Sequence, residues 1–93
     1  MANTLEELYC ENYCGVDQNG IFELKKLRIL GCDDNKKIKD VNHLANTLEE
    51  LDCESGSGID QKGISELRKL KRLNFLGNKK IINTNHISII NHI

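Results

Sequence analysis

Four short stretches of the chain alternate apolar and polar residues with a period of two. Each follows the order Leu-x-x-Leu-x-Cys, or Leu-x-x-Leu-x-Phe in the last stretch. A period of two indicates a β-strand with one buried and one exposed face. The pattern therefore predicts four strands, near residues 7–10, 29–32, 50–53 and 72–75.

The four stretches recur at nearly constant spacing. Their first leucines are 22, 21 and 22 residues apart, at Leu5, Leu27, Leu48 and Leu70. Strands this short bury too little surface alone, so we expect them to stack in parallel with a return segment after each. The units span about 5–26, 27–47, 48–69 and 70–93, within one domain of residues 1–93.

The chain also contains a longer duplication, which covers two units at a time. Residues 1–43 and 44–86 align without a gap and are identical at 25 of 43 positions. Between the strands, 17–27 and 60–70 each begin with Asp and end with basic residues, which predicts short helices. The shorter segment 40–46 predicts a 3₁₀ turn or a single α turn.

The units resemble leucine-rich repeats, whose signature is L-x-x-L-x-L-x-x-N/C. Asn35 and Asn78 occupy the Asn position, and Cys in the third Leu position is similar to repeats of some bacterial and giant-virus proteins. The resemblance covers essentially the whole chain. It implies an α/β leucine-rich repeat solenoid with four parallel strands and short helices or 3₁₀ turns on the convex side. Tyr13 and Gly56 replace the Asn in the first and third units, which interrupts the expected Asn ladder.

Charge and composition exclude some classes of function. The chain has 13 Lys and Arg against 14 Asp and Glu, a formal charge of −1, which argues against nucleic-acid and membrane-surface partners. From the acidic start of the chain and the short apolar stretches we expect neither a signal peptide nor a membrane-spanning helix. Four cysteines are too few for a disulfide scaffold, so we expect a cytoplasmic protein with reduced thiols, in the host-cell cytoplasm if it is viral or from an intracellular parasite.

The outward strand positions should form the concave face, which is the usual binding surface in the family that the chain resembles. Six of these twelve positions are acidic and one is basic. They are Glu7, Tyr9, Glu11, Ile29, Gly31, Asp33, Glu50, Asp52, Glu54, Arg72, Asn74 and Leu76. All except Gly31 and Leu76 are candidate partner-binding residues.

This acidic face has two interpretations. It is either a site for a basic segment of a partner protein, or a solvated face whose charge maintains solubility. The resemblance implies a non-catalytic protein–protein interaction module. The alternative is a structural role in which copies of the chain form a homo-oligomer through their uncapped ends.

The ends motivate that alternative. The first strand has only four residues before it, and the last thirteen residues contain six isoleucines and no charge. This tail either folds over the fourth unit, with Ile87 and Ile90 as a partial cap, or is buried against the open edge of another copy.

No residue pattern predicts catalysis, a metal site or a cofactor. Cys10, Cys32 and Cys53 share one inward position and are expected as packed thiols, with Cys14 in the following turn. His43 and His86 are equivalent turn residues rather than ligands. Gly56-Ser57-Gly58 lacks the Gly-Lys-Ser/Thr of a phosphate loop. The basic residues of turns and convex side are interpreted as solvated surface: Lys25, Lys26, Lys36, Lys37, Arg68, Lys69, Lys79 and Lys80.

Overall fold

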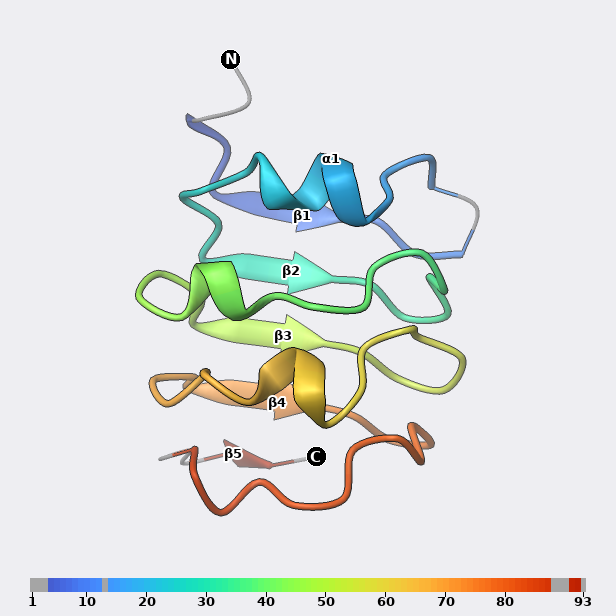
Figure 1. Ribbon diagram of the computed structural model, residues 1–93, viewed down its shortest axis with the longest axis vertical. Coiled ribbons are helices and arrows are strands. Elements are labelled where there is room, and N and C mark those ends of the chain that lie inside the picture. The colour runs from blue at the N-terminus through green and yellow to red at the C-terminus, as the bar shows by residue number, and fades with distance from the viewer. Residues whose placement is uncertain (1–3, 13, 88–90, 93) are drawn as a thin grey trace.

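One parallel sheet organises the chain in a computed structural model that describes residues 4–12, 14–87 and 91–92 (Figure 1). The strands lie side by side in sequence order, which confirms the four predicted parallel strands. They are β1 (Glu7–Tyr9), β2 (Ile29–Gly31), β3 (Glu50–Asp52), β4 (Arg72–Asn74) and β5 (Asn91–His92). The register pairs Leu8, Leu30, Leu51 and Leu73 across neighbouring strands, so that all four belong to the same face of the sheet.

The return segments all lie on one side of the sheet (Figure 1). They contain the helix α1 (Gln18–Phe22) and the 3₁₀ turns η2 (Asn42–Leu44) and η3 (Lys62–Ile64). The 3₁₀ turn expected within 40–46 is therefore confirmed.

The helices expected over 17–27 and 60–70 are much shorter than predicted. Helix α1 has five residues, and only a 3₁₀ turn forms in the second segment. A helix of eleven residues would be about 16 Å long, whereas the chain must also return to a strand about 4.8 Å from the previous one. At η3 the packing is especially close, because a Cβ atom at Gly63 would collide with the backbone of Lys39.

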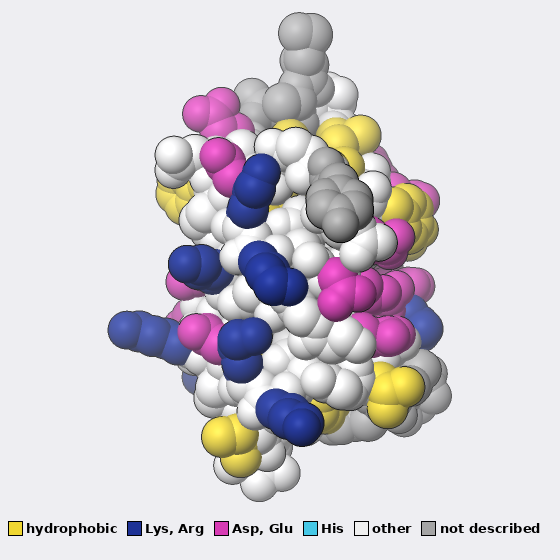
Figure 2. Space-filling model, turned by 90° about the vertical axis from the view of Figure 1, so that its right-hand side faces the viewer, with side chains coloured by type: hydrophobic (Ala, Val, Ile, Leu, Met, Phe, Trp, Pro, Cys, Tyr) yellow, Lys and Arg dark blue, Asp and Glu magenta, His cyan; other side chains and the backbone are white. Residues whose placement is uncertain are grey.

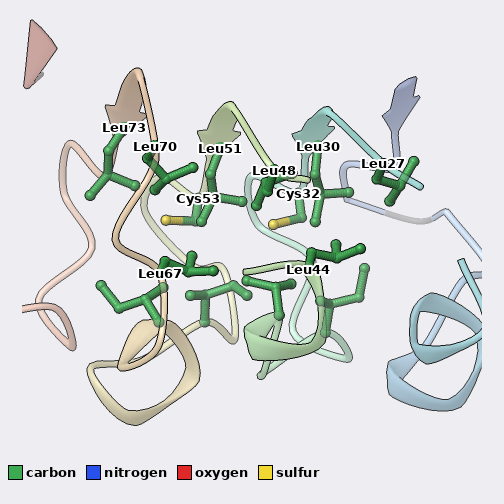
Figure 3. Packing of buried hydrophobic residues seen from close by; sticks show 14 of the residues in the cluster. Leu27, Leu30, Cys32, Leu44, Leu48, Leu51, Cys53, Leu67, Leu70 and Leu73 are labelled. Atoms are coloured by element: carbon green, nitrogen blue, oxygen red, sulfur yellow. The ribbon is translucent and has the colours of Figure 1, made fainter. Parts of the chain in front are cut away.

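Leucines from every turn of the chain form a continuous core between the sheet and the return segments (Figure 3). Leu30, Leu51 and Leu73 come from the strands, and Leu44 and Leu67 from the return segments, with at most 1% of each exposed. Burial of one such side chain contributes about 1.5–3 kcal/mol. The row of leucines predicted as inward-facing is thus the main hydrophobic core.

Two buried asparagines join successive turns of the chain. Asn35 Nδ2 donates to the carbonyl of Cys10 at 3.0 Å, and Asn78 Nδ2 donates to those of Cys53 and Ile59 at 2.8 and 3.0 Å. The Oδ1 atom of each asparagine accepts a backbone N–H of its own turn. Lys37 N donates to Asn35 Oδ1 at 2.9 Å, and Lys80 N donates to Asn78 Oδ1 at 3.0 Å. These contacts satisfy carbonyl groups that would otherwise be buried without a partner.

Two other side chains repeat the same interactions 43 residues apart. Gln18 Oε1 accepts from the N–H of Lys39 at 2.8 Å, and Gln61 Oε1 accepts from that of Ile82 at 2.8 Å. Each glutamine therefore bonds to the next return segment. His43 and His86 instead bond to the preceding return segment.

His43 Nε2 lies 2.9 Å from the carbonyl of Ile21, and His86 Nε2 lies 3.0 Å from that of Ile64. Burial lowers the pKa of His43, so its neutral form is favoured. Both histidines connect adjacent return segments, a structural role in agreement with their assignment as turn residues.

The C-terminal tail extends the sheet, which the sequence did not predict. β5 pairs in parallel with β4, placing His92 opposite Leu73. Ile87 is 5% exposed and belongs to the core, which confirms its part in capping the fourth unit; Ile90 lies outside the described residues. Within the described part of the chain, no helix is long and apolar enough to cross a bilayer.

The buried asparagines give a first prediction. Replacement of Asn78 by Ala leaves the carbonyls of Cys53 and Ile59 without their donor, and should lower the free energy of unfolding by about 2–3 kcal/mol. Asn46→Ala, at an exposed position, is the matched control and should change it by less than about 0.5 kcal/mol. Urea denaturation measures both variants, and equal effects would contradict the structural role of Asn78.

Candidate binding face

The sheet face turned away from the return segments, here called the open face, carries the predicted outward side chains. Residues at equivalent positions lie in rows across the sheet, for example Glu7, Ile29, Glu50 and Arg72. All ten candidate residues are partly or fully exposed. The structure therefore gathers them on one surface, and their role in binding remains a prediction.

The most exposed apolar side chains of the open face lie on its first and fourth units. Tyr9 is 61% exposed and Leu76 is 64% exposed. Gly31, an outward position by sequence, is instead buried, and a Cβ atom there would lie 3.1 Å from Tyr9 Cδ1 and 3.0 Å from Glu11 Oε2. The missing side chain thus leaves room for Tyr9 and Glu11 to approach β2.

An acidic row follows the first three strands, formed by Glu11, Asp33 and Glu54. Asp33 Oδ1 accepts the backbone N–H of Glu54 at 2.8 Å, which fixes it between its neighbours. Among the described residues, no Lys, Arg or His nitrogen lies within 4 Å of these three carboxylates. Like charges on adjacent strands destabilise their pairing, so a cation brought to this row would relieve repulsion.

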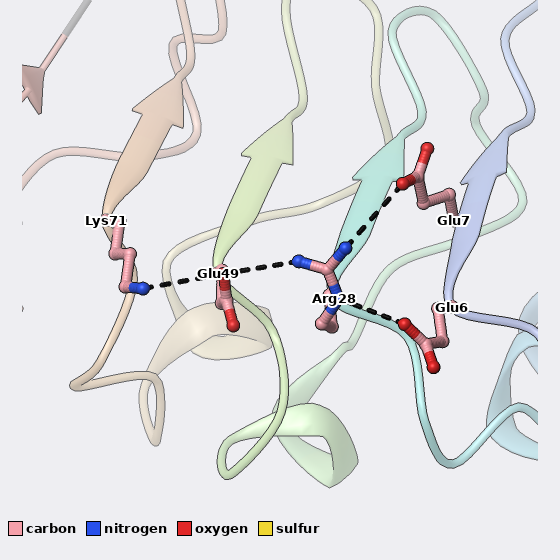
Figure 4. A network of polar contacts seen from close by, with 5 residues as sticks. All are labelled: Glu6, Glu7, Arg28, Glu49 and Lys71. Carbon is pink, nitrogen blue, oxygen red and sulfur yellow. Dashed lines mark hydrogen bonds and ion pairs between the residues drawn. The ribbon is translucent and has the colours of Figure 1, made fainter.

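Most charges at the other end of the strands are paired, although Glu50 has no cation within 4 Å among the described residues. Arg28 lies among Glu6, Glu7 and Glu49 at 3.1, 3.7 and 3.4 Å, and Lys71 lies 3.6 Å from Glu49 (Figure 4). The hydrogen bond to Glu6 is the main cause that raises the pKa of Arg28, so it stays cationic. The acidic character of the open face is therefore concentrated where the strands end.

This ion-pair network was missed in the sequence, although a signal for it exists. The residue after the first leucine of each unit is Glu6, Arg28, Glu49 and Lys71 in turn. Because the units stack in register, alternating signs at this position place opposite charges on neighbouring turns. A second pair, Arg72 with Asp52 at 2.9 Å, crosses from β4 to β3.

The cysteines correct one expectation. Cys10 and Cys14 form a disulfide, with Cα atoms 5.1 Å apart, so the prediction of four reduced thiols with a free Cys14 is wrong. The turn after β1 brings Cys14 back to the sulfur of Cys10. Cys32 and Cys53 are free and buried as expected.

The free thiols are poorly suited to chemistry. Burial raises the pKa of Cys32 to about 12 and also raises that of Cys53. A thiolate is the reactive form of cysteine, so both thiols are protonated and unreactive near neutral pH. Within the described residues, no group of three His, Cys, Asp or Glu side chains is placed to hold a metal ion.

Comparison of the chain with protein-family models, curated proteins and solved structures found no match.

The disulfide and the buried thiols give a second prediction. In native protein without reductant, iodoacetamide should modify none of the cysteines rapidly, because two are bonded and two are buried and protonated. Unfolding in urea should expose two reactive thiols, and unfolding with a reductant all four. Mass spectrometry counts the modified residues. Four modified cysteines in urea without reductant would contradict the disulfide.

Proposed function

We propose that this chain is a non-catalytic protein-binding module whose open face docks a basic segment of a partner protein. Its fold would be a leucine-rich repeat solenoid, with the open face as the concave side. The successive parallel strands and the polar contacts repeated 43 residues apart support this assignment.

One observation carries the proposal, namely the uncompensated acidic row of Glu11, Asp33 and Glu54. Glu6, Glu7 and Glu49 at the start of the strands pair with Arg28 or Lys71, whereas no cation of the described residues lies within 4 Å of this row. Complementary charge steers a partner and specifies its orientation. A segment rich in Lys or Arg is the partner chemistry that fits.

The surroundings of the row support a peptide-sized partner. Tyr9 and Leu76 supply exposed apolar surface on the first and the fourth unit. Aromatic residues contribute strongly to protein interfaces when a partner covers them. A basic segment that also carries apolar residues would use both parts of the open face.

The test is a charge reversal with a matched control. The double variant Glu11→Lys, Glu54→Lys reverses the equivalent ends of the row, while Glu23→Lys, Glu66→Lys makes the same charge change at exposed, equivalent positions on the return segments. The probe is a fluorescent peptide that alternates lysine with apolar residues. We expect the open-face variant to weaken binding by about tenfold or more, and the control variant by much less.

Salt dependence provides an independent measurement of the same site. Exposed charges are screened within about 8 Å at physiological ionic strength, so the affinity should fall as sodium chloride is added. Fluorescence anisotropy measures both series. Equal losses in the two double variants, or an affinity unaffected by salt, would remove the open face from consideration.

A second candidate function, self-association, is favoured by the edge at β1. Cys10 N donates to Gly31 O, Asn12 N donates to Asp33 O, and Glu6 O accepts from Ile29 N. The even-numbered residues of this segment therefore face the neighbouring strand. The backbone of Glu7 and Tyr9 therefore faces away from the sheet. Leu5 is 39% exposed, whereas its equivalent Leu48 is 2% exposed. We propose that a further copy of the chain can add to this edge.

Light scattering over a tenfold dilution series tests this candidate. Association should increase with concentration and be abolished by Tyr9→Pro, because proline removes an edge N–H. Tyr9→Thr keeps the N–H and should retain association. A monomer at every concentration, or equal loss in both variants, would contradict pairing through β1.

A further inference from the structure

A hollow of about 390 Å³ lies at the edge of the sheet where the strands end, the same edge that carries the acidic row. It is lined by Lys36, Lys39, Gly56, Gly58, Asp60 and Lys80. Figure 2 views this edge and shows a line of Lys and Arg side chains beside a group of Asp and Glu side chains. The hollow brings together lysines from the turns after β2 and β4.

Two glycines of the turn after β3 allow the turn after β2 to pack closely against them. A Cβ atom at Gly56 would lie 2.8 Å from Asp34 Oδ1 and 2.9 Å from Lys36 Nζ. A Cβ atom at Gly58 would lie 2.6 Å from the carbonyl oxygen of Lys36, so this turn packs directly on the previous one. The absence of both side chains lets Lys36 approach this turn, and the hollow lies between the lysines of the two flanking turns.

Acidic groups lie near the lysines of the hollow without forming close ion pairs, and Asp34 Oδ1 approaches the same point beside Gly56 as Lys36 Nζ. Lys80 Nζ donates to the carbonyl of Ser57 at 3.2 Å, and Lys36 Nζ lies next to Gly56 on the other side of the same turn. Among the described residues, no carboxylate oxygen lies within 4 Å of Lys36, Lys39 or Lys80. Asp60, the one acid of the lining, accepts the N–H of Gly63 at 2.8 Å.

The backbone of the glycine turn cannot itself bind an anion, because its N–H groups already donate within the chain. Gly56 N donates to Asp34 Oδ1 at 2.8 Å, Ser57 N to the carbonyl of Glu54, and Gly58 N to that of Asn35. Recognition would therefore depend on the three ammonium groups. Lysine binds phosphate as a point charge, so a ligand with several closely spaced negative charges is favoured over a monoanion.

We propose that this hollow is a binding site for ligands that carry two or more linked phosphate groups. The sequence Gly56-Ser57-Gly58 lacks the lysine of a phosphate loop, and the fold supplies lysines from the two flanking turns instead. None of the described residues that line the hollow is an aromatic one that could stack on a base. The phosphate groups, rather than an attached nucleoside, therefore determine affinity.

The test titrates inorganic pyrophosphate into ¹⁵N-labelled protein at constant ionic strength and follows the backbone amides of Gly56 and Gly58 by NMR. The variant Lys36→Gln, Lys80→Gln should weaken binding by about tenfold or more. The matched control Lys26→Gln, Lys69→Gln removes the same charge at exposed, equivalent positions outside the hollow. It should change the affinity by less than about twofold, and Lys36→Arg, Lys80→Arg should retain binding because both charges remain.

Further ligands identify the chemistry that is recognised. ADP should bind about as well as pyrophosphate, orthophosphate more weakly, and adenosine not at all. An absence of saturable shifts with pyrophosphate would overturn the proposal, as would equal losses in the pocket and control variants. Stronger binding of adenosine than of pyrophosphate would show that the phosphate groups are not the feature recognised.

Discussion

Buried carbonyl groups at the turns that follow the strands are the constraint on which the arrangement of this chain depends. Backbone hydrogen bonds between neighbouring units continue into these turns, for example from Cys53 N to the carbonyl of Asn74. The carbonyls of Cys10 and Cys53 instead accept from the side chains of Asn35 and Asn78. Asn35 of the second unit bonds to the first unit, and Asn78 of the fourth unit bonds to the third. Each asparagine therefore joins two successive units into a pair. In the third unit, Ser57 is fully buried and accepts the N–H of Ile59 at 3.3 Å in its own turn. The structural period is therefore two turns, which matches the 43-residue duplication.

Stacking in register converts single sequence positions into rows, and this determines where charge accumulates. Alternation of Glu6, Arg28, Glu49 and Lys71 pairs opposite charges along one row. Acidic residues at the position of Glu11 recur without alternation, so their charges add instead of cancelling. The same stacking that stabilises one end of the strands thus creates an electrostatic potential at the other.

The four strands and their inward faces could be predicted because period two and constant spacing constrain a parallel stack directly. β5 could not be predicted, because His92 pairs with Leu73 at a spacing of only 19 residues. His92 also occupies the position that is leucine in the other strands. The disulfide depends on the turn after β1, where Asn12 adopts a φ of 51°. Asp34, Ser55 and Gly77 have positive φ at the equivalent place in later turns, and no shared residue type marks it. The open-face residues could be predicted because side chains alternate between the two faces of a strand. The lysine hollow could not, because its residues come from separate turns.

The two proposed sites lie near the same edge of the sheet, so their effects on each other have a defined sign. Asp34 follows Asp33 of the acidic row in the chain, and its Oδ1 accepts the N–H of Gly56 in the lysine hollow at 2.8 Å. The positive charge of the lysines weakens the negative potential of the acidic row. An anion bound by the lysines would offset that charge and make the potential of the row more negative. A basic segment on the open face would then be held more tightly, and by linkage it would increase the affinity for the anion by the same factor. Screening limits this coupling to distances of about 8 Å at physiological salt. The coupling would therefore be strongest for a partner that contacts Asp33 and Glu54, which lie in the same turns as Asp34 and Gly56.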